Sequence, residues 1–166
     1  MRIMAMGDSN TYGIIDKLNR ESGGYRIKLD QKLEAAGYQS DFVGTLSSGP
    51  APDNQHEGYN GQTLDWLALK AHQVVPIHKP DVILLMAGSN DLKTDSLATM
   101  KTEMAKLLDV LSKDAPNATI LVATLPPPQP GNTSGQSTAL AAEFNKALPG
   151  IVAGKAAAGN LARLAG

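Results

Sequence analysis

The chain has 166 residues, 42% of them apolar, with 15 basic and 16 acidic side chains. This length supports one core, so we expect a single domain over residues 1–166. The balanced charge argues against a nucleic-acid partner, which requires clustered Lys and Arg, and the lack of cysteine excludes disulfides and a cysteine nucleophile. Neither a bilayer-spanning apolar run of roughly 20 residues nor a signal-peptide core is present, so we expect no membrane partner and a cytoplasmic protein, or a secreted one whose signal was removed.

The first third of the chain predicts a strand, a helix, a second strand and a long loop. Ile3–Met6 is short and apolar, as in a buried strand, and residues 41–45 (DFVGT) resemble a second one. From residue 46 to 61 the chain is rich in Ser, Gly, Pro, Asp and Asn, which predicts a surface loop of the kind that often carries function. The intervening helix ends before Gly37, and its apolar residues recur every four positions: Tyr25, Leu29 and Leu33.

The rest of the chain alternates helices with strands. A helix that begins near Thr63 precedes the apolar strand 81–87, and a second helix precedes the strand 118–125. A proline-rich loop over 126–135 leads to a last helix, and residues 160–166 resemble the start of a strand. The three helices present apolar faces made of Leu64, Leu67, Ala71, Val74 and Val75; of Leu97, Met100, Met104, Leu107, Leu108 and Leu111; and of Leu140, Phe144, Leu148, Ile151 and Val152. This order favours an α/β fold with a parallel sheet.

Ser9 is the first candidate for chemistry. It follows the first strand in MAMGDSNTYG, at the carboxyl edge where open α/β sheets bind ligands. Serine and aspartate are also preferred as helix caps, so Asp8 or Ser9 has a purely structural alternative.

Two further segments are expected near the same edge. Asn90 lies in GSND, which follows the strand 81–87, and its amide is suited to stabilise an oxyanion, worth roughly 3 kcal/mol in acyl transfer. Gly61 lies in HEGYNGQT near a helix start, where a backbone N–H can point at an anion. Taken alone, GSND also fits a simple turn and Gly61 a loop position with positive φ. Together with Ser9, however, they form a nucleophile with two oxyanion donors.

The order GDS, loop glycine and GxND resembles the first three conserved blocks of the SGNH (GDSL-like) hydrolases. The segments GYRIKLDQKLEAAGYQSDFVGTLSSGP, HEGYNGQTLDWL and KPDVILLMAGSNDL are similar to the third carbohydrate-esterase family, chiefly acetylxylan esterases. The resemblance implies a three-layer α/β/α sandwich with a flavodoxin-like parallel sheet, here lacking most of the last strand and the final helix. It also implies a serine esterase that needs no cofactor and removes acetyl groups from carbohydrate.

The resemblance assigns roles to individual residues. Ser9 is the expected nucleophile, and the Ser9 N–H, the Gly61 N–H and the Asn90 side chain are the expected oxyanion hole. Asp8 and Asp91 are expected to support these loops.

The resemblance also concerns Gly88 and His56. Gly88 opens the GSND turn and is expected to support it. His56, in HEG, lies in a segment that borders the cleft in the resembled family, so it is expected to bind substrate; the alternative is a solvent-exposed loop histidine.

His72 and His78 have no motif context and are interpreted as surface or helix-end residues, whereas Trp66 is expected in the core. No ligand pair among the dispersed histidines has metal-site spacing, so the sequence does not indicate a metal.

The sequence departs from the family pattern because it contains no DxxH block, which supplies the general base and the Asp that orients it. General-base help is typically worth 10²- to 10⁴-fold, although oxyanion hole and binding alone leave about 10³- to 10⁴-fold over water. We therefore expect an esterase for small acyl esters or acetylated carbohydrate, weakly active unless another histidine substitutes. Alternatives are a lipase, thioesterase or arylesterase, or an inactive SGNH-fold protein that binds carbohydrate or a partner chain.

A missing outer strand and final helix would uncover a sheet edge and an apolar face. Proteins usually cover such surfaces by pairing with another chain, so we expect self-association, for example as a dimer.

Overall fold

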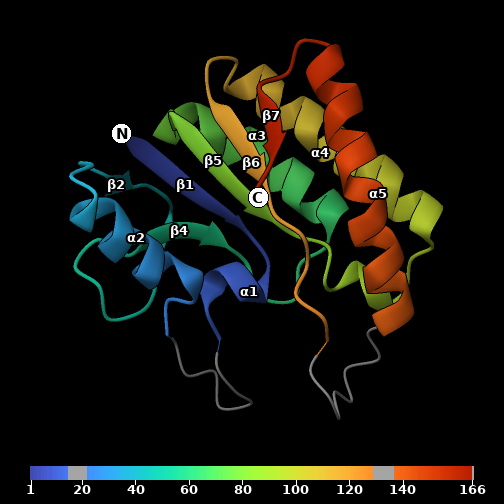
Figure 1. Cartoon of the computed structure of the whole chain (residues 1–166), viewed down its shortest axis with the longest axis horizontal. Coiled ribbons are helices and arrows are strands. Elements are labelled where there is room, and N and C mark those ends of the chain that lie inside the picture. Colours follow the sequence, from blue (N-terminus) through green and yellow to red (C-terminus); the bar gives the residue numbers. More distant parts are fainter. Residues whose placement is uncertain (15–21, 129–136, 166) are drawn as a thin grey trace.

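A mostly parallel sheet forms the centre of the molecule (Figure 1). The computed structural model describes residues 1–14, 22–128 and 137–165. The strand order is β3-β4-β1-β5-β6-β7, with β2 also paired to β1, and only the pair β3–β4 is antiparallel. The strands are β1 (Arg2–Gly7), β2 (Asp41–Phe42), β3 (Leu46–Ser47), β4 (Gln55–Gly58), β5 (Val82–Met86), β6 (Thr119–Val122) and β7 (Ala162–Leu164). This architecture confirms the predicted α/β fold with a parallel sheet.

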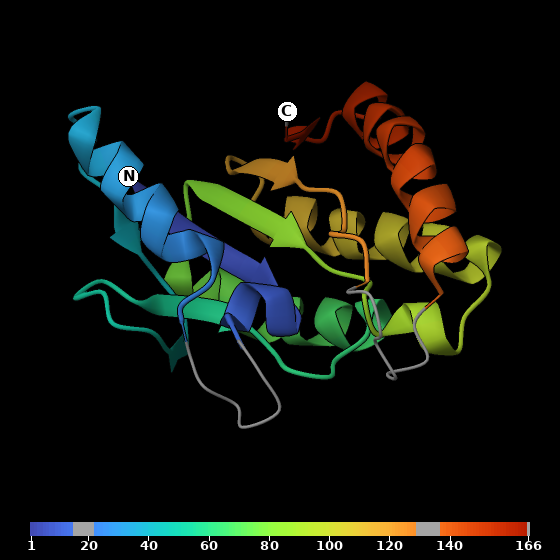
Figure 2. The same cartoon turned by 60° about the horizontal axis from the view of Figure 1, so that its bottom comes forward.

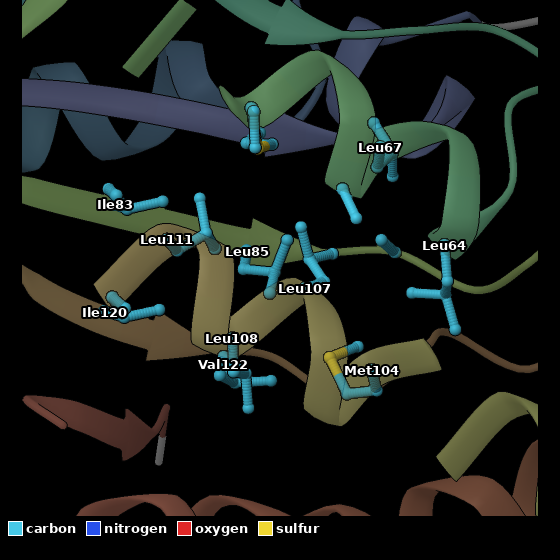
Figure 3. Close-up of a cluster of buried hydrophobic side chains, with 14 of the residues drawn as sticks. Leu64, Leu67, Ile83, Leu85, Met104, Leu107, Leu108, Leu111, Ile120 and Val122 are labelled. Atoms are coloured by element: carbon cyan, nitrogen blue, oxygen red, sulfur yellow. The ribbon is translucent and has the colours of Figure 1, made fainter. Parts of the chain in front are cut away.

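Among the described residues, three long helices cover one face of the sheet and α2 (Tyr25–Ala35) covers the other (Figures 1 and 2). The first layer contains α3 (Leu64–His78), α4 (Leu97–Asp114) and α5 (Thr138–Ala157), and the opposite layer contains α2 (Tyr25–Ala35). Figure 3 shows side chains of α3 and α4, among them Leu67 and Leu107, packed against β5 and β6. The predicted apolar faces of these helices are thus the faces that build the core.

The central strands are apolar on both faces because helices lie on both sides. On β5, Ile83 and Leu85 are fully buried beneath the three-helix layer, whereas Leu84 and its neighbours on the α2 side are half-buried. Here α2 packs through Tyr25, Leu29 and Leu33 against β1 and β2. Beside α2 lies an apolar groove of about 430 Å³, lined by Tyr25, Leu29, Leu84, Leu85, Met86, Leu121, Ala123 and Ala165.

Several sequence-based boundaries are wrong. The predicted loop over 46–61 contains the antiparallel pair β3–β4, and the second predicted strand is limited to β2 at residues 41–42. β4 was not predicted because its sequence, QHEG, is polar, although three of its four residues are buried. Helix α3 begins after Thr63 as predicted.

The C-terminal part agrees more closely with the prediction. Residues 162–164 pair with β6 as β7, the edge strand, so the predicted strand start is confirmed. The proline-rich loop predicted over 126–135 lies partly outside the described residues. Of the helices that the structure describes, none has the length and apolar character needed to cross a membrane.

Candidate active site

The turn after β1 places Ser9 at the start of the short helix α1 (Ser9–Tyr12), where its side chain is half-buried. Asp8 precedes it as the N-cap and is fully buried. The Asp8 carboxylate accepts hydrogen bonds from the Asn10 backbone N–H (2.9 Å), from Asn10 Nδ2 (3.0 Å) and from the Ser89 N–H (3.1 Å). Asp8 therefore both caps α1 and joins the turn after β1 to the turn after β5.

Gly7 allows these two turns to approach closely. A Cβ atom at this position would lie 2.0 Å from the carbonyl oxygen of Met86 and 2.4 Å from Thr11 Oγ1. Only glycine fits between β1 and β5 here, which explains why the strand ends in Gly-Asp-Ser.

Asn90 lies in the turn after β5 and is half-buried. Its Nδ2 donates to the backbone oxygen of Gln62 at 2.9 Å, which ties this turn to the segment before α3. A side-chain amide carries two hydrogens, so this bond leaves the second one for another acceptor. Gly61, adjacent to Gln62, is exposed and has φ of +77°, a left-handed conformation that glycine adopts without strain.

Asp91 reinforces the same junction. It is fully buried in the short 3₁₀ helix η1 (Asp91–Lys93), and its Oδ1 accepts a hydrogen bond from the Leu64 N–H at 2.9 Å. The Thr63 side chain makes no capping bond, so Asp91 caps α3 from a distant part of the chain.

Gly88 gives the turn after β5 a backbone conformation that other residues rarely adopt. Its φ of +119° is strained for any side chain, and a Cβ there would come within 3.2 Å of the Phe144 ring. The turn that presents Asn90 therefore depends on glycine at this position.

Two of these hydrogen bonds bring the three predicted segments together. The Asp8 bond joins the turn of Ser9 to the turn of Asn90, and the Asn90 bond joins that turn to the segment of Gly61. The segments gather at the carboxyl ends of the parallel strands β1 and β5, where ligands of open α/β sheets bind.

His56 is buried in a strand, whereas we expected it beside the cleft or in a solvent-exposed loop. It is on β4 with no exposed surface, its Nδ1 accepts from the Gly58 N–H (2.9 Å), and its Nε2 lies 2.8 Å from Ser48 Oγ. Because Nδ1 is an acceptor, the proton is on Nε2 and the ring is neutral. The solvent-exposed alternative is wrong, and the expected substrate contact is not open to a side chain that is fully buried with both nitrogens engaged.

Burial and the neighbouring charge of Arg26 together explain this neutral state. Its side chain, 2% exposed, donates to Ser48 Oγ at 2.8 Å and crosses from α2 towards β4. Burial first and the Arg26 charge second lower the pKa of His56 to about 4. The guanidinium also donates to the backbone oxygens of Thr11, Tyr12, Ser48 and Asn54. Sequence reasoning missed Arg26, because arginine on an amphipathic helix is normally exposed.

On the other face of β4, Glu57 is also fully buried. It accepts from the Thr45 N–H at 2.6 Å and from the Tyr59 hydroxyl, and His78 Nε2 lies 3.5 Å away. Burial and then the bond with Glu57 raise the pKa of Tyr59. The Tyr59 ring packs edge-on against Trp66, which itself packs on the main core.

The other two histidines have partners of their own. His78 ends α3 beside Glu57, and His72 is 69% exposed with Nδ1 2.8 Å from Asp114. Within residues 1–14, 22–128 and 137–165, no histidine forms a hydrogen bond with Ser9.

Comparisons with known proteins agree with this architecture. The sequence model of the GDSL-like lipase/acylhydrolase family matches residues 5–158. A multidomain esterase of Ruminococcus flavefaciens is 29% identical over 173 residues, which cover 89% of this chain and 22% of that protein. The chain thus spans about a fifth of the length of this curated relative.

Solved structures are similar over nearly the whole chain. A family 3 carbohydrate esterase of Clostridium thermocellum is 36% identical, with a TM-score of 0.83 over 99% of this chain and 76% of that one. A family 3 carbohydrate esterase from Talaromyces cellulolyticus is 23% identical, with a TM-score of 0.81 over 99% and 78%, and supports the fold. The match over residues 5–158, on a sheet whose turns gather GDS and GSND at one edge, shows that the chain belongs to the GDSL-like lipase/acylhydrolase family.

Proposed function

We propose that this acylhydrolase is a serine esterase that cleaves short acyl esters through an acyl-serine intermediate, with O-acetylated carbohydrate as its substrate class. The observation that carries the proposal is a pair of hydrogen bonds that hold three segments at one sheet edge: the Ser89 N–H donates to the Asp8 carboxylate, and the Asn90 amide donates to the Gln62 carbonyl. A serine at a strand-to-helix turn beside two oxyanion donors is the arrangement that acyl transfer requires.

In the proposed reaction, Ser9 Oγ attacks the ester carbonyl carbon and loses its proton. The negative charge that develops on the carbonyl oxygen accepts hydrogen bonds from the Ser9 N–H, the Gly61 N–H and the second amide hydrogen of Asn90. The tetrahedral intermediate collapses: the bond between the carbonyl carbon and the ester oxygen breaks, that oxygen takes up the proton lost by Ser9 and leaves as the alcohol, and the acyl group stays on Ser9. Water then attacks the acyl-serine, which releases the carboxylic acid and restores the hydroxyl.

The proton acceptor determines how fast this chemistry runs. A serine hydroxyl is a weak nucleophile until a base removes its proton, and such help is typically worth 10²- to 10⁴-fold. No described histidine is bonded to Ser9, and the buried nitrogens of His56 are already engaged. We therefore propose weak activity for residues 1–166 alone.

The substrate class rests on similarity and on the character of the loops. The solved esterase that is 36% identical is a family 3 carbohydrate esterase. The segment around Gly61 is polar and exposed, which suits a hydrated sugar ester better than a long acyl chain.

Hydrolysis of p-nitrophenyl acetate tests the esterase proposal. We expect a burst of p-nitrophenol followed by slow turnover, and no burst from Ser9→Ala. The matched control is Ser47→Ala, an exposed serine on β3, which should keep the burst. An equal rate in Ser9→Ala and the unmodified protein would overturn the assignment of Ser9.

Two further measurements separate the alternatives. Acetylated xylooligosaccharide should be cleaved faster than a p-nitrophenyl ester with a long acyl chain, and the reverse order would indicate a lipase or thioesterase. An organophosphonate should label Ser9 covalently, whereas an inactive SGNH-fold binding protein would leave the serine unmodified. The membership in a family of hydrolases favours the first outcome.

A further inference from the structure

Three carboxylates gather behind the turn that carries Asn90. Asp91 on η1, Asp95 just after it and Glu103 on α4 each offer an oxygen, and these oxygens lie within 4.8 Å of one another. Asp91 is buried, and Asp95 and Glu103 are half-buried. Three negative charges this close repel one another strongly unless something positive lies between them.

Two of the oxygens in this cluster lack partners. Asp91 has no exposed surface; its Oδ1 is used by the Leu64 N–H, and its Oδ2 is buried without a hydrogen-bond partner among the described residues. Glu103 Oε2 is likewise buried without a donor group beside it in the described part of the chain. Its side chain is within hydrogen-bonding reach of the Asp91 carboxyl, which also raises the pKa of Glu103. Burying an unpaired carboxylate oxygen is expensive, so both atoms require a proton or a cation.

The surroundings add more negative charge. Burial first, and then acidic neighbours that include Asp95, raise the pKa of both Asp91 and Glu103. Lys106 on α4 is already paired with Asp65, with its Nζ 2.6 Å from Oδ1. The electrostatics of the cluster therefore favour the uptake of positive charge.

We propose that Asp91, Asp95 and Glu103 bind a Ca²⁺ ion. Carboxylate oxygens are the ligands that this hard cation prefers, at about 2.3–2.6 Å, so two ligands on opposite sides of one ion lie roughly 4.6–5.2 Å apart. Oxygens within 4.8 Å of one another meet that limit without rearrangement. Mg²⁺ usually keeps several waters and is bound through one or two carboxylates, so three protein carboxylates favour Ca²⁺. Histidine spacing cannot indicate such a site, since its ligands are carboxylates from a turn and a helix.

The ion would connect η1 to α4 and hold Asp91, whose other oxygen caps α3. Asn90 precedes Asp91 in the chain, so the same ion would steady the turn that presents the Asn90 amide. Because the three carboxylates come together only in the folded protein, Ca²⁺ binding would stabilise the folded state.

Calorimetric titration of the metal-stripped protein with CaCl2, together with thermal unfolding, tests the proposal without reference to catalysis. We expect one Ca²⁺ per chain and a Tm that rises with CaCl2 concentration. Asp95→Asn and Glu103→Gln should each weaken binding at least tenfold and reduce the Tm response. The matched control is Asp109→Asn, an α4 carboxylate that pairs with Lys155, which should respond like the unmodified protein.

A comparison in metal-free buffer separates loss of Ca²⁺ binding from loss of folding. There, Glu103→Gln should fold and be at least as stable as the unmodified protein, because one repelling charge is gone. The proposal is overturned if millimolar CaCl2 produces neither heat nor a Tm shift in the unmodified protein. It is also overturned if the Asp95→Asn/Glu103→Gln double variant responds to CaCl2 as strongly as the unmodified protein, or if the protein binds MgCl2 more tightly than CaCl2.

Discussion

Asn90 combines a structural and a proposed chemical role in one side-chain amide, because one hydrogen bonds the Gln62 carbonyl and the other is free for an oxyanion. Asn90→Ala should lower kcat/KM for p-nitrophenyl acetate by about 10²- to 10³-fold. Loss of the bond to Gln62 should reduce stability by only about 1 kcal/mol. Gln62→Ala retains the backbone acceptor and is the control, and an Asn90→Ala protein with unchanged kcat/KM would remove Asn90 from the oxyanion hole.

The buried neutral state of His56 makes stability depend on pH. Its pKa is lowered to about 4 in the folded protein, so between about pH 6.5 and pH 4 the unfolded chain binds a proton that the folded protein does not. The stability from this residue is complete above about pH 6.5 and decreases as the pH falls to 4, by at most about 1.4 kcal/mol per pH unit.

Urea unfolding at a series of pH values measures this effect. His56→Gln should flatten the stability profile between pH 4 and 6.5, whereas the control His72→Gln, at an exposed position, should leave the slope unchanged. An unchanged slope in His56→Gln would show that another group controls acid stability.

At the residue scale, the sequence predicted the positions that depend on the local order of strands and turns. Ser9 and Asn90 follow apolar strands, so their place at the same edge follows from the chain direction of parallel strands. His56 and Arg26 were misplaced or missed because their burial depends on contacts between α2, α1 and β4. Such long-range hydrogen bonds leave no periodic signal in the sequence.

At the level of secondary-structure elements, the approach of β1 to β5 is the most demanding contact. Gly7→Ala would place a methyl group 2.0 Å from the Met86 carbonyl oxygen, so the two strands must separate. We expect a loss of about 3 kcal/mol or more in the free energy of unfolding. Gly154→Ala is the control: it lies in α5 with open space around it and should stabilise the protein by about 0.5–1 kcal/mol. Equal stability of the two variants in urea would contradict this packing.

The helices and central strands were predictable because their apolar periodicity matches the layers they form. The pair β3–β4 was not, because the buried His56 and Glu57 are satisfied by hydrogen bonds that a hydrophobicity pattern cannot detect. The sequence predicted no end for α3. The helix continues through Pro76 to His78, although proline usually ends a helix.

At the scale of the whole molecule, the two faces of the sheet are covered unequally. Three helices cover one face, whereas in the described residues α2 alone covers the other, beside the apolar groove of about 430 Å³. β7 forms an edge strand and leaves Leu164 38% exposed. We predict that residues 1–166 self-associate through this surface.

Size-exclusion chromatography with light scattering tests this prediction. The unmodified protein should have a mass above that of one chain, and Leu164→Lys should shift it towards the monomer. A monomer at all concentrations would reject self-association.

In the proposed reaction, Ser9 Oγ is the atom that receives the acyl group. Mass spectrometry of the protein quenched with acid during turnover of p-nitrophenyl acetate, followed by peptide mapping, measures this directly. We expect one acetyl group on the peptide that contains Ser9 and none on the same peptide of Asn90→Ala at the same early time. An acetyl group on lysines only, or on no residue while product still forms, would contradict it.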